Sequence, residues 1–191
     1  KLHKMLDPQG GKTIMITSTL PSEGKSTVAA NLALALAEKG RRVALLDCDF
    51  RKPSLQKIFE VSVKNEKNLP SYLLQEATDP MPYLLESKKY GIWLGLNQNS
   101  GRSITKLLNN GKLPKLLEQL SERMDYILLD TPPMLAAADT ETLAAMVDTA
   151  LLVVRADFMP TESINKGLDR LRKSAPEVCG FVLNNYYTNV L

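Results

Sequence analysis

The sequence has few of the residues that mark disulfide-bonded, zinc-binding or membrane-spanning proteins. It contains two cysteines, Cys48 and Cys179, which stand far apart and outside any CxxC pair, and a single histidine, His3. Neither a zinc site nor a disulfide framework is therefore expected, and a reducing cytosolic compartment fits best. No apolar stretch approaches the roughly 18 residues that a membrane span needs. Residues 1–11 also lack the apolar core of a secretory signal.

The sequence also lacks a large excess of charge of either sign. It has 24 Lys and Arg residues against 21 Asp and Glu residues, which gives a net charge of +3 with the histidine neutral. This excess is too small to indicate nucleic-acid binding by bulk electrostatics, so no nucleic-acid partner is expected. Hydrophobic residues make up 44% and charged residues 24%, which is typical of globular proteins and excludes disordered and fibrous classes. We expect residues 1–191 to form a single domain.

Short apolar runs alternate with longer amphipathic ones along the chain. Several of the short runs are continuously apolar, as expected of parallel strands that are covered on both faces. Strands are expected over residues 13–18, 42–46, 91–96, 126–129, 150–154 and 180–183. Helices are expected over residues 25–39, 54–59, 70–75, 104–123, 139–146 and 162–174. The alternation predicts an α/β fold with a doubly wound, mostly parallel sheet flanked by helices.

The strongest chemical signal is the segment STLPSEGKST at residues 18–27, which lies between an expected strand and a long expected helix. In that context backbone N–H groups and the positive end of the helix dipole bind phosphate, which predicts the P-loop NTPase type of this fold. Gly24 lets the backbone approach the phosphate, Lys25 reaches the β- and γ-phosphates, and the Ser26 hydroxyl ligates Mg²⁺. The strict pattern has another glycine where this chain has Thr19. The residues expected to bind the nucleotide are Ser22, Glu23, Gly24, Lys25, Ser26 and Thr27.

Acidic residues follow two further expected strands. Asp47 and Asp49 follow the second strand, and Asp130 ends a later one. Ligands of open parallel sheets gather at the carboxyl ends of the strands, so these carboxylates are expected near the phosphate loop. Asp47 and Asp49 are spaced by two and can project to the same side of an extended segment, where they would repel each other unless a metal or Lys25 compensates. Together with Ser26, the three acids are the expected metal ligands; the alternative is that they make turns at the strand ends.

Three segments of the sequence, PSEGKST, VALLDCDFRKP and YILLDTPP, together resemble the three boxes of the bacterial tyrosine kinases of capsule and exopolysaccharide synthesis. The resemblance runs from about Ile14 to Asn185 and includes GFVLNN near the end of the chain. It implies a fold related to the division-site and partitioning ATPases, ATP and Mg²⁺ as cofactors, and phosphoryl transfer to tyrosine. Asn184 matches an adenine-contacting position of the wider superfamily. The residues expected to carry catalysis are Lys25, Asp47, Asp49 and Asp130, with Asp49 or Asp47 accepting the tyrosine proton.

The resemblance also implies acceptors and partners. Tyr186 and Tyr187, directly after the last expected strand, are the candidate autophosphorylation sites; the alternative is that they pack near the adenine, because the family usually carries a longer tyrosine-rich tail. The implied partners are a membrane activator of the chain-length-determinant type, tyrosine-containing protein substrates including the chain itself, and further copies in a homo-oligomer. Because the first residue is Lys1 rather than methionine, the sequence is compatible with a piece of a longer chain. We expect a cytoplasmic protein at the inner face of the plasma membrane, held there by its partner or by an N-terminal region outside this sequence.

The alternative function is that of a partitioning-type nucleotide-switch ATPase without tyrosine kinase activity. Those relatives carry a lysine four residues before the loop glycine, where this chain has Leu20. Leu20, together with Arg51 and Pro53 after the second acid, favours the kinase. The short segment after the last expected strand favours the ATPase.

Overall fold

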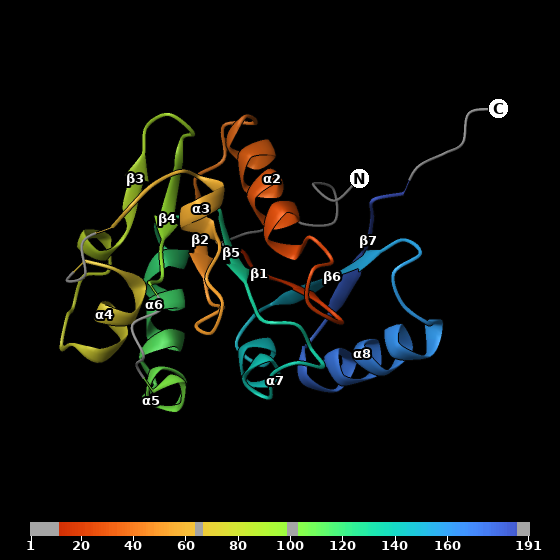
Figure 1. The fold of residues 1–191 in the computed structure, drawn as a ribbon. Helices are drawn as coiled ribbons and strands as arrows, with labels where there is room; N and C mark the ends of the chain where they lie inside the picture. Colours follow the sequence, from red (N-terminus) through yellow and green to blue (C-terminus); the bar gives the residue numbers. More distant parts are fainter. Residues whose placement is uncertain (1–11, 64–66, 99–102, 187–191) are drawn as a thin grey trace.

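The structure, a computed structural model, describes residues 12–63, 67–98 and 103–186, which form a seven-stranded sheet with helices on both faces (Figure 1). The strands are β1 (Lys12–Ser18), β2 (Val43–Asp47), β3 (Leu85–Ser87), β4 (Ile92–Gly95), β5 (Tyr126–Asp130), β6 (Thr149–Arg155) and β7 (Val178–Asn184). Their order across the sheet is β3-β4-β2-β5-β1-β6-β7. β3 pairs antiparallel with β4, and the other neighbouring strands are parallel. The expected α/β fold with a doubly wound, mostly parallel sheet is confirmed.

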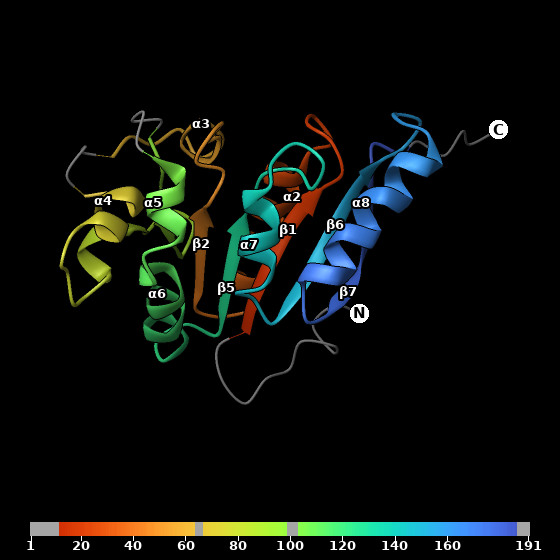
Figure 2. The same cartoon turned by 90° about the horizontal axis from the view of Figure 1, so that it is seen from below.

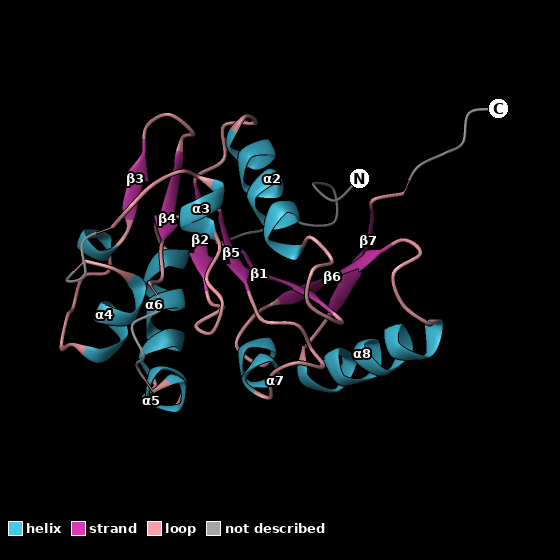
Figure 3. Ribbon diagram, viewed as in Figure 1, coloured by secondary structure: helices cyan, strands magenta, loops and turns pink. Residues whose placement is uncertain are grey.

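The helices divide between the two faces of the sheet (Figure 2, Figure 3). α2 (Lys25–Ala37) and α3 (Leu55–Ile58) cover one face. The helices on the other face are α4 (Leu69–Leu74), α5 (Ile104–Leu108), α6 (Lys112–Ser121), α7 (Asp139–Ala144) and α8 (Thr161–Ser174). A short 3-10 helix, η1, covers Met81–Tyr83. None of the helices in the described ranges combines the length and the apolar character needed to cross a bilayer.

Two details of the sequence-based expectation are wrong. The single helix expected over residues 104–123 is two helices, α5 and α6, which are separated by a turn. Gly111 caps α6 with φ 71°, a left-handed conformation that interrupts the helical path and favours glycine. The short edge strand β3 was not expected, because it lies in the stretch around residues 64–90 that shows no regular pattern.

The two faces of the sheet have separate hydrophobic cores. Successive residues of β1 alternate between them: Ile14 and Ile16 pack toward α2, and Met15 packs toward α6. The face of α2 that meets the sheet carries small side chains, including Ala29 and Ala33, so the helix axis can lie close to the strands. Burial on both faces explains why the strands are continuously apolar in sequence.

The register of the central strands determines where the polar residues meet. β5 lies between β1 and β2, and Asp130 at its end pairs with Ile16 on one side and with Asp47 on the other. All three strands are parallel, so their carboxyl ends lie at one edge of the sheet. The loop after β1 and the acidic residues after β2 and β5 are therefore brought together.

Candidate active site

The loop between β1 and α2 has the conformation of an anion-binding turn. Ser22 and Gly24 adopt positive φ angles of 67° and 86°, and Gly24 is the residue from which α2 starts. The first turn of α2 carries no acidic residue, so the positive end of the helix dipole and its free N–H groups are available to phosphate. The chain folds this way because the apolar run of β1 ends at Ser18 and the helix-forming run begins at Lys25.

Lys25 meets two carboxylates that are remote from it in sequence. Its Nζ atom lies 3.4 Å from Asp49 Oδ2 and 3.8 Å from Asp130 Oδ1, and it is 3.2 Å from the Ser26 hydroxyl. The Lys25 side chain is only 14% exposed, so these charges interact in a poorly solvated space. The structure therefore brings the three expected segments to one point.

Asp47 and Asp49 have different environments, although the sequence suggested equivalent roles. Asp49 Oδ1 accepts hydrogen bonds from the backbone N–H groups of Lys52 (2.9 Å) and Arg51 (3.3 Å), which leaves Oδ2 facing Lys25. Asp47 Oδ2 instead accepts from the N–H groups of Ser54, which precedes α3, and of Leu55, the first residue of α3, both at 3.0 Å. Asp49 is thus turned toward the loop lysine, and Asp47 holds the start of α3.

Burial changes the proton affinity of the acidic groups. Burial, together with the negative charge of Asp130, holds the pKa of Asp47 well above its usual range. Burial also raises the pKa of Asp130 to about 6, although the Lys25 charge and a hydrogen bond with Ser26 oppose the rise. The Ser54 hydroxyl donates to Asp130 Oδ2 at 3.4 Å. Each carboxylate would be stabilised by a cation placed beside it.

These residues fit a magnesium ion of the P-loop kind. Oδ1 of Asp47 and Oδ1 of Asp130 are buried and have no hydrogen-bond partner in the described part of the chain, a costly state that a cation or its bound water would relieve. Within the described ranges no group of three or more His, Cys, Asp or Glu residues converges as a metal cage. Mg²⁺ is typically held by one or two carboxylates, substrate phosphates and water, and the Ser26 hydroxyl beside Asp130 is compatible with that arrangement.

A hollow of about 370 Å³ opens over this group of charges. Its inner end is formed by Lys25, Ser26 and Asp49, and its rim carries Arg51 and Lys52. The segment after Asp130 contributes an apolar wall, formed by Pro132, Pro133, Ala136 and Ala137. A charged end for phosphate and an apolar wall for a second group are thus combined in one space.

Ser54 and Arg51 link the elements around this hollow, and the motif analysis gave neither of them this role. Ser54 connects the second and third boxes, since it donates through its backbone to Asp47 and through its side chain to Asp130. Arg51 forms an ion pair with Asp139 at the start of α7. The signal for Ser54 was its position at the start of the helix expected over residues 54–59, where serine is common; nothing local predicted the partner of Arg51.

Other predicted site residues lie around the loop. The Glu23 carboxylate is buried and points away from the phosphate side, toward β6. Asn184, at the end of β7, donates from Nδ2 to the Glu23 carbonyl at 2.8 Å. Thr27 is exposed in the first turn of α2, and Tyr186 is 63% exposed after β7. Tyr187 lies outside the described residues.

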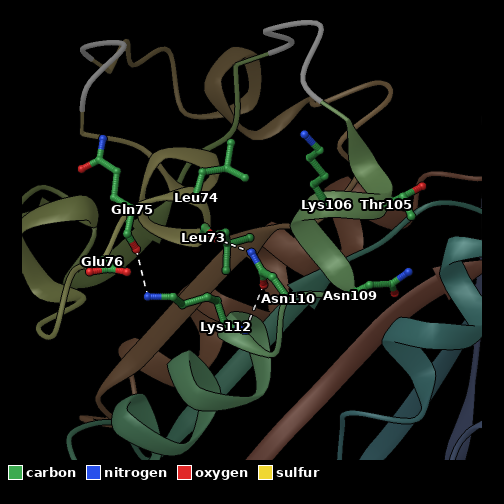
Figure 4. A pocket seen from close by; sticks show the side chains of 9 residues that line it. All are labelled: Leu73, Leu74, Gln75, Glu76, Thr105, Lys106, Asn109, Asn110 and Lys112. Carbon is green, nitrogen blue, oxygen red and sulfur yellow. Dashed lines mark hydrogen bonds between the residues drawn. The ribbon is translucent and has the colours of Figure 1, made fainter.

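A second hollow, of about 560 Å³, lies between α4, α5 and the start of α6 (Figure 4). Its polar groups are used to hold its walls together: Lys112 Nζ donates to the Gln75 carbonyl at 2.9 Å, and Asn110 Nδ2 donates to the Leu73 carbonyl at 2.6 Å. Its one carboxylate, Glu76, does not follow a parallel strand, whereas Lys25 of the first hollow lies beside two carboxylates from strand ends. The candidate active site is therefore the hollow at the phosphate loop.

Comparison with known proteins identifies the family of the chain. A family model described as ParA, an NUBPL iron-transfer P-loop NTPase, matches residues 10–190. The chain is 31% identical over 177 residues to tyrosine-protein kinase YwqD of Bacillus subtilis, covering 91% of this chain and 72% of that protein. It is also 30% identical to a protein of Klebsiella pneumoniae named "putative tyrosine-protein kinase in cps region" and 28% identical to tyrosine-protein kinase etk of Escherichia coli, but spans only 25% of the length of each.

Solved structures resemble the fold closely. The kinase domain of the Escherichia coli tyrosine kinase ETK superposes with a TM-score of 0.86 at 27% identity, covering 94% of this chain and 69% of that one. The cell division ATPase MinD of Pyrococcus furiosus superposes with a TM-score of 0.79 at 27% identity, covering 92% and 73%. The same fold therefore serves a tyrosine kinase and a cell division ATPase.

Proposed function

This chain belongs to the ParA family of P-loop NTPases and, within it, to the bacterial tyrosine-protein kinases, and from that premise we propose that it transfers the γ-phosphoryl group of ATP to tyrosine hydroxyls. The observation that carries the proposal is the position of Lys25, whose ammonium lies beside Asp49 and Asp130 at the head of α2. We further propose that the activity serves the polymerisation and export of capsular or exopolysaccharide, which the name of the Klebsiella relative, from a cps region, supports.

The residues of the loop suit the stabilisation of a loose phosphoryl-transfer transition state. Charge in that state lies on the phosphoryl oxygens, and Lys25 and the free N–H groups of α2 supply fixed positive charge for it. Magnesium, held by Ser26 and Asp130, would neutralise further phosphate charge when it is bound. The bond between the γ-phosphorus and the bridging oxygen breaks as the phenol oxygen bonds to phosphorus.

Asp49 is suited to accept the proton that the phenol loses. Its Oδ1 atom is held by two backbone N–H groups, so the carboxylate is fixed, and its Oδ2 atom points at the Lys25 ammonium. When Lys25 turns to the phosphates, Oδ2 loses that partner and becomes available as an acceptor. A phenol with a pKa of about 10 is a weak nucleophile, so the proton leaves late, as attack acidifies it.

The apolar wall of the hollow is the proposed place of the tyrosine ring. Pro132, Pro133 and Ala137 are buried, and the small side chains leave room for a flat aromatic group. The wall faces the same space as Lys25 and Asp49, so a ring resting on it would have its hydroxyl near the transferred group. The acceptor tyrosine and ATP would thus share one hollow.

Incubation with Mg²⁺ and ATP, followed by mapping of phosphate by mass spectrometry, tests the proposal. We expect phosphotyrosine in the wild-type chain and a loss of at least about 100-fold in Lys25→Met, because the transition-state charge loses its main counter-charge. Lys39→Met, an exposed lysine just after α2, is the matched control and should retain full activity. Phosphate release with unmodified tyrosines would reject the kinase in favour of an ATPase.

A partitioning-type nucleotide-switch ATPase is the second candidate function, and the similarity to MinD supports it. The sequence of the phosphate loop does not favour this ATPase function. Position 20 carries leucine rather than the signature lysine of those relatives, and the Leu20 N–H is bound by the Glu23 carboxylate at 2.7 Å. No cation is therefore supplied from that position.

We also propose that the chain acts at the inner face of the plasma membrane, beside a membrane activator, and assembles with further copies of itself. The resemblance to the tyrosine kinases of capsule and exopolysaccharide synthesis, which implies a membrane activator, supports the first part. The proposed phosphorylation of Tyr186 by a second copy of the chain supports the second. Co-purification of the chain with membrane vesicles that carry the activator, compared with vesicles that lack it, tests the attachment. Recovery in the soluble fraction in both cases would reject it.

A further inference from the structure

A buried carboxylate closes the phosphate loop from within. The Glu23 side chain is 1% exposed, although it belongs to a loop at the surface. Its Oε2 atom accepts the backbone N–H of Leu20 at 2.7 Å, three residues back in the same loop. Its Oε1 atom accepts the backbone N–H of Arg155, the last residue of β6, at 3.2 Å. One side chain therefore holds together two turns of the loop and fixes them to the sheet.

The ends of β6 and β7 hold the same loop at two more points. The Arg155 guanidinium donates from Nη1 to the Ser22 carbonyl at 3.3 Å. Asn184 donates from Nδ2 to the Glu23 carbonyl at 2.8 Å. Arg155 and Asn184 are paired in register at the ends of the two strands, so these contacts come from one rigid corner of the sheet.

The conformation that these contacts hold is one that the chain does not adopt by itself. Ser22 has φ 67°, in the left-handed region, where a residue with a Cβ is strained. Two residues later, Gly24 has φ 86°, and a Cβ at that position would lie 2.1 Å from Asn184 Nδ2. Such a loop persists only if the surrounding structure determines it, and the contacts of Glu23, Arg155 and Asn184 do so.

We propose that Glu23 is a positioning residue, whose carboxylate shapes the phosphate cradle before the nucleotide arrives without itself contacting the nucleotide. The inference rests on the proposed function, because it concerns the affinity of the loop for ATP. A carboxylate that faced the phosphates would repel them; directed toward β6, it turns the Leu20 N–H inward and leaves the N–H groups at the start of α2 for the phosphates. The ordering of the loop is then complete in the free protein, so binding does not have to supply it.

The test is Glu23→Gln, measured on the full chain by calorimetric titration with Mg·ATP and by steady-state phosphoryl transfer. The amide keeps one acceptor oxygen but presents its NH₂ group to the other backbone N–H, so one of the two hydrogen bonds is lost. We expect the Kd and the KM for ATP to rise at least about tenfold, while kcat at saturating ATP stays within about twofold, since the reacting atoms are untouched.

Asp148→Asn is the matched control. The Asp148 carboxylate also accepts a backbone N–H, from Thr13 at 2.7 Å, but at the opposite end of β1 from the loop. It should leave the Kd and the KM for ATP unchanged. If Glu23 served stability alone, Glu23→Gln and Asp148→Asn would lower the free energy of unfolding to a similar extent. Neither variant would then raise the KM for ATP while leaving kcat unchanged.

Arg155→Ala is the second variant, in case Glu23→Gln does not fold. It removes the contact to the Ser22 carbonyl but keeps the backbone N–H that Glu23 accepts, so we expect the Kd for ATP to rise about two- to tenfold with kcat preserved. A fall in kcat without a change in KM would overturn the inference, because Arg155 would then act on the reacting group. If wild type binds ATP and both variants bind it equally well, the inference alone fails. If wild type binds no ATP, both the proposed function and the inference are rejected.

Discussion

Gly167 of α8 lies directly against Thr19, the first residue of the phosphate loop. A Cβ at position 167 would lie 2.9 Å from both Cγ2 and Oγ1 of Thr19, closer than side chains normally approach. Thr19 is fully buried, and its hydroxyl has no hydrogen-bond partner in the described part of the chain. The strict phosphate-loop pattern has glycine where this chain has Thr19. In the strict pattern the loop glycine leaves room for the covering helix. Here Gly167 on that helix leaves room for Thr19 on the loop.

Gly167→Ala is therefore expected to destabilise the protein, although alanine is the better helix former. Helix propensity alone would favour alanine by about 1 kcal/mol, whereas forcing a methyl group into a packed contact costs about 1–3 kcal/mol. The net loss should lower the melting temperature by a few degrees, at about 2–4 °C per kcal/mol for a chain of this size. Thermal unfolding followed by circular dichroism measures it.

The same substitution in a Thr19→Gly background is the control, and its sign should reverse. With the threonine side chain gone, the methyl group at position 167 meets no clash, and only the helix-propensity gain of up to about 1 kcal/mol remains. An equal effect of Gly167→Ala in both backgrounds would show that the two residues do not interact energetically.

The course of the chain was largely predictable, because the central strands are buried on both faces and so appear as continuous apolar runs. The error at residues 104–123 came from reading hydrophobic spacing through the sequence Asn109-Asn110-Gly111, whose glycine ends the helical path. The contact of Thr19 with Gly167 could not be predicted, since nothing in either local sequence reports a partner so far along the chain. Long-range packing of this kind is a property of the assembled layers.

The site was predictable to the level of which segments meet, but the directions of its side chains were not. Parallel strands end at one edge, so Lys25, Asp49 and Asp130 could be expected near one another. Glu23 has its direction fixed by the N–H of Arg155, and Asp47 by the start of α3; both partners come from tertiary structure. The motifs predicted which residues lie near the site, but the contacts of each side chain depend on tertiary packing.

Asp47→Asn should stabilise the protein in the absence of divalent metal. Asp47 is fully buried, and an asparagine oxygen can still accept the N–H groups of Ser54 and Leu55 while the buried negative charge beside Asp130 disappears. Because burial disfavours this charge, its removal should raise the free energy of unfolding by on the order of 1 kcal/mol. Urea unfolding in EDTA measures this.

Asp125→Asn provides the contrast for that measurement. Asp125 is partly exposed and accepts hydrogen bonds from both the backbone and the guanidinium of Arg42. Its replacement should lower the free energy of unfolding slightly, by up to about 1 kcal/mol. Destabilisation by Asp47→Asn of the size expected for a lost salt bridge would mean that the Asp47 charge is already compensated in the metal-free protein.

The stability of the metal-free protein should depend on the protonation of Asp130. Its pKa is raised to about 6 in the folded protein from an ordinary 3.8, because burial outweighs the Lys25 charge. A raised folded-state pKa means that the folded chain binds this proton more tightly than the unfolded chain does. The stabilisation is complete below about pH 4 and is lost as the pH rises to about 6, with a total on the order of 3 kcal/mol.

The difference in the free energy of unfolding between wild type and Asp130→Asn isolates this effect, since the other titrating groups are common to both. Measured in EDTA, the stability of the wild type relative to Asp130→Asn should fall between pH 4 and about pH 6 and should stay constant above pH 7. A difference that is constant over that range would show that Asp130 has the same proton affinity in the folded and unfolded states.

Tyr186 should be phosphorylated by a second copy of the chain. It is 63% exposed, whereas Tyr72 and Tyr126 are buried in the core and out of reach of any kinase. The carboxylate at the end of β5 is not adjacent to it, because β7 is an edge strand and Asp130 lies three strand spacings, or about 14 Å, across the sheet (Figure 1). Asn184, two residues before Tyr186, donates to the Glu23 carbonyl of the phosphate loop, and this bond restrains the segment that carries the tyrosine.

A mixing experiment separates reaction between chains from reaction within a chain. An active chain carrying Tyr186→Phe is incubated with an inactive Lys25→Met chain that keeps its tyrosine, and phosphate on Tyr186 of the inactive chain is measured by mass spectrometry. We expect it to appear, and the initial rate of autophosphorylation in the wild type to rise with the square of the protein concentration. The opposite outcome is that Tyr186 is modified only in chains with an intact Lys25, at a rate per chain that does not depend on protein concentration. That outcome would require the segment around Tyr186 to leave β7 and fold back over its own loop. The bonds of Asn184 to the Glu23 carbonyl and of its carbonyl to the Ala156 N–H oppose that movement, so the reaction between chains is the one that the fold permits at the lower cost.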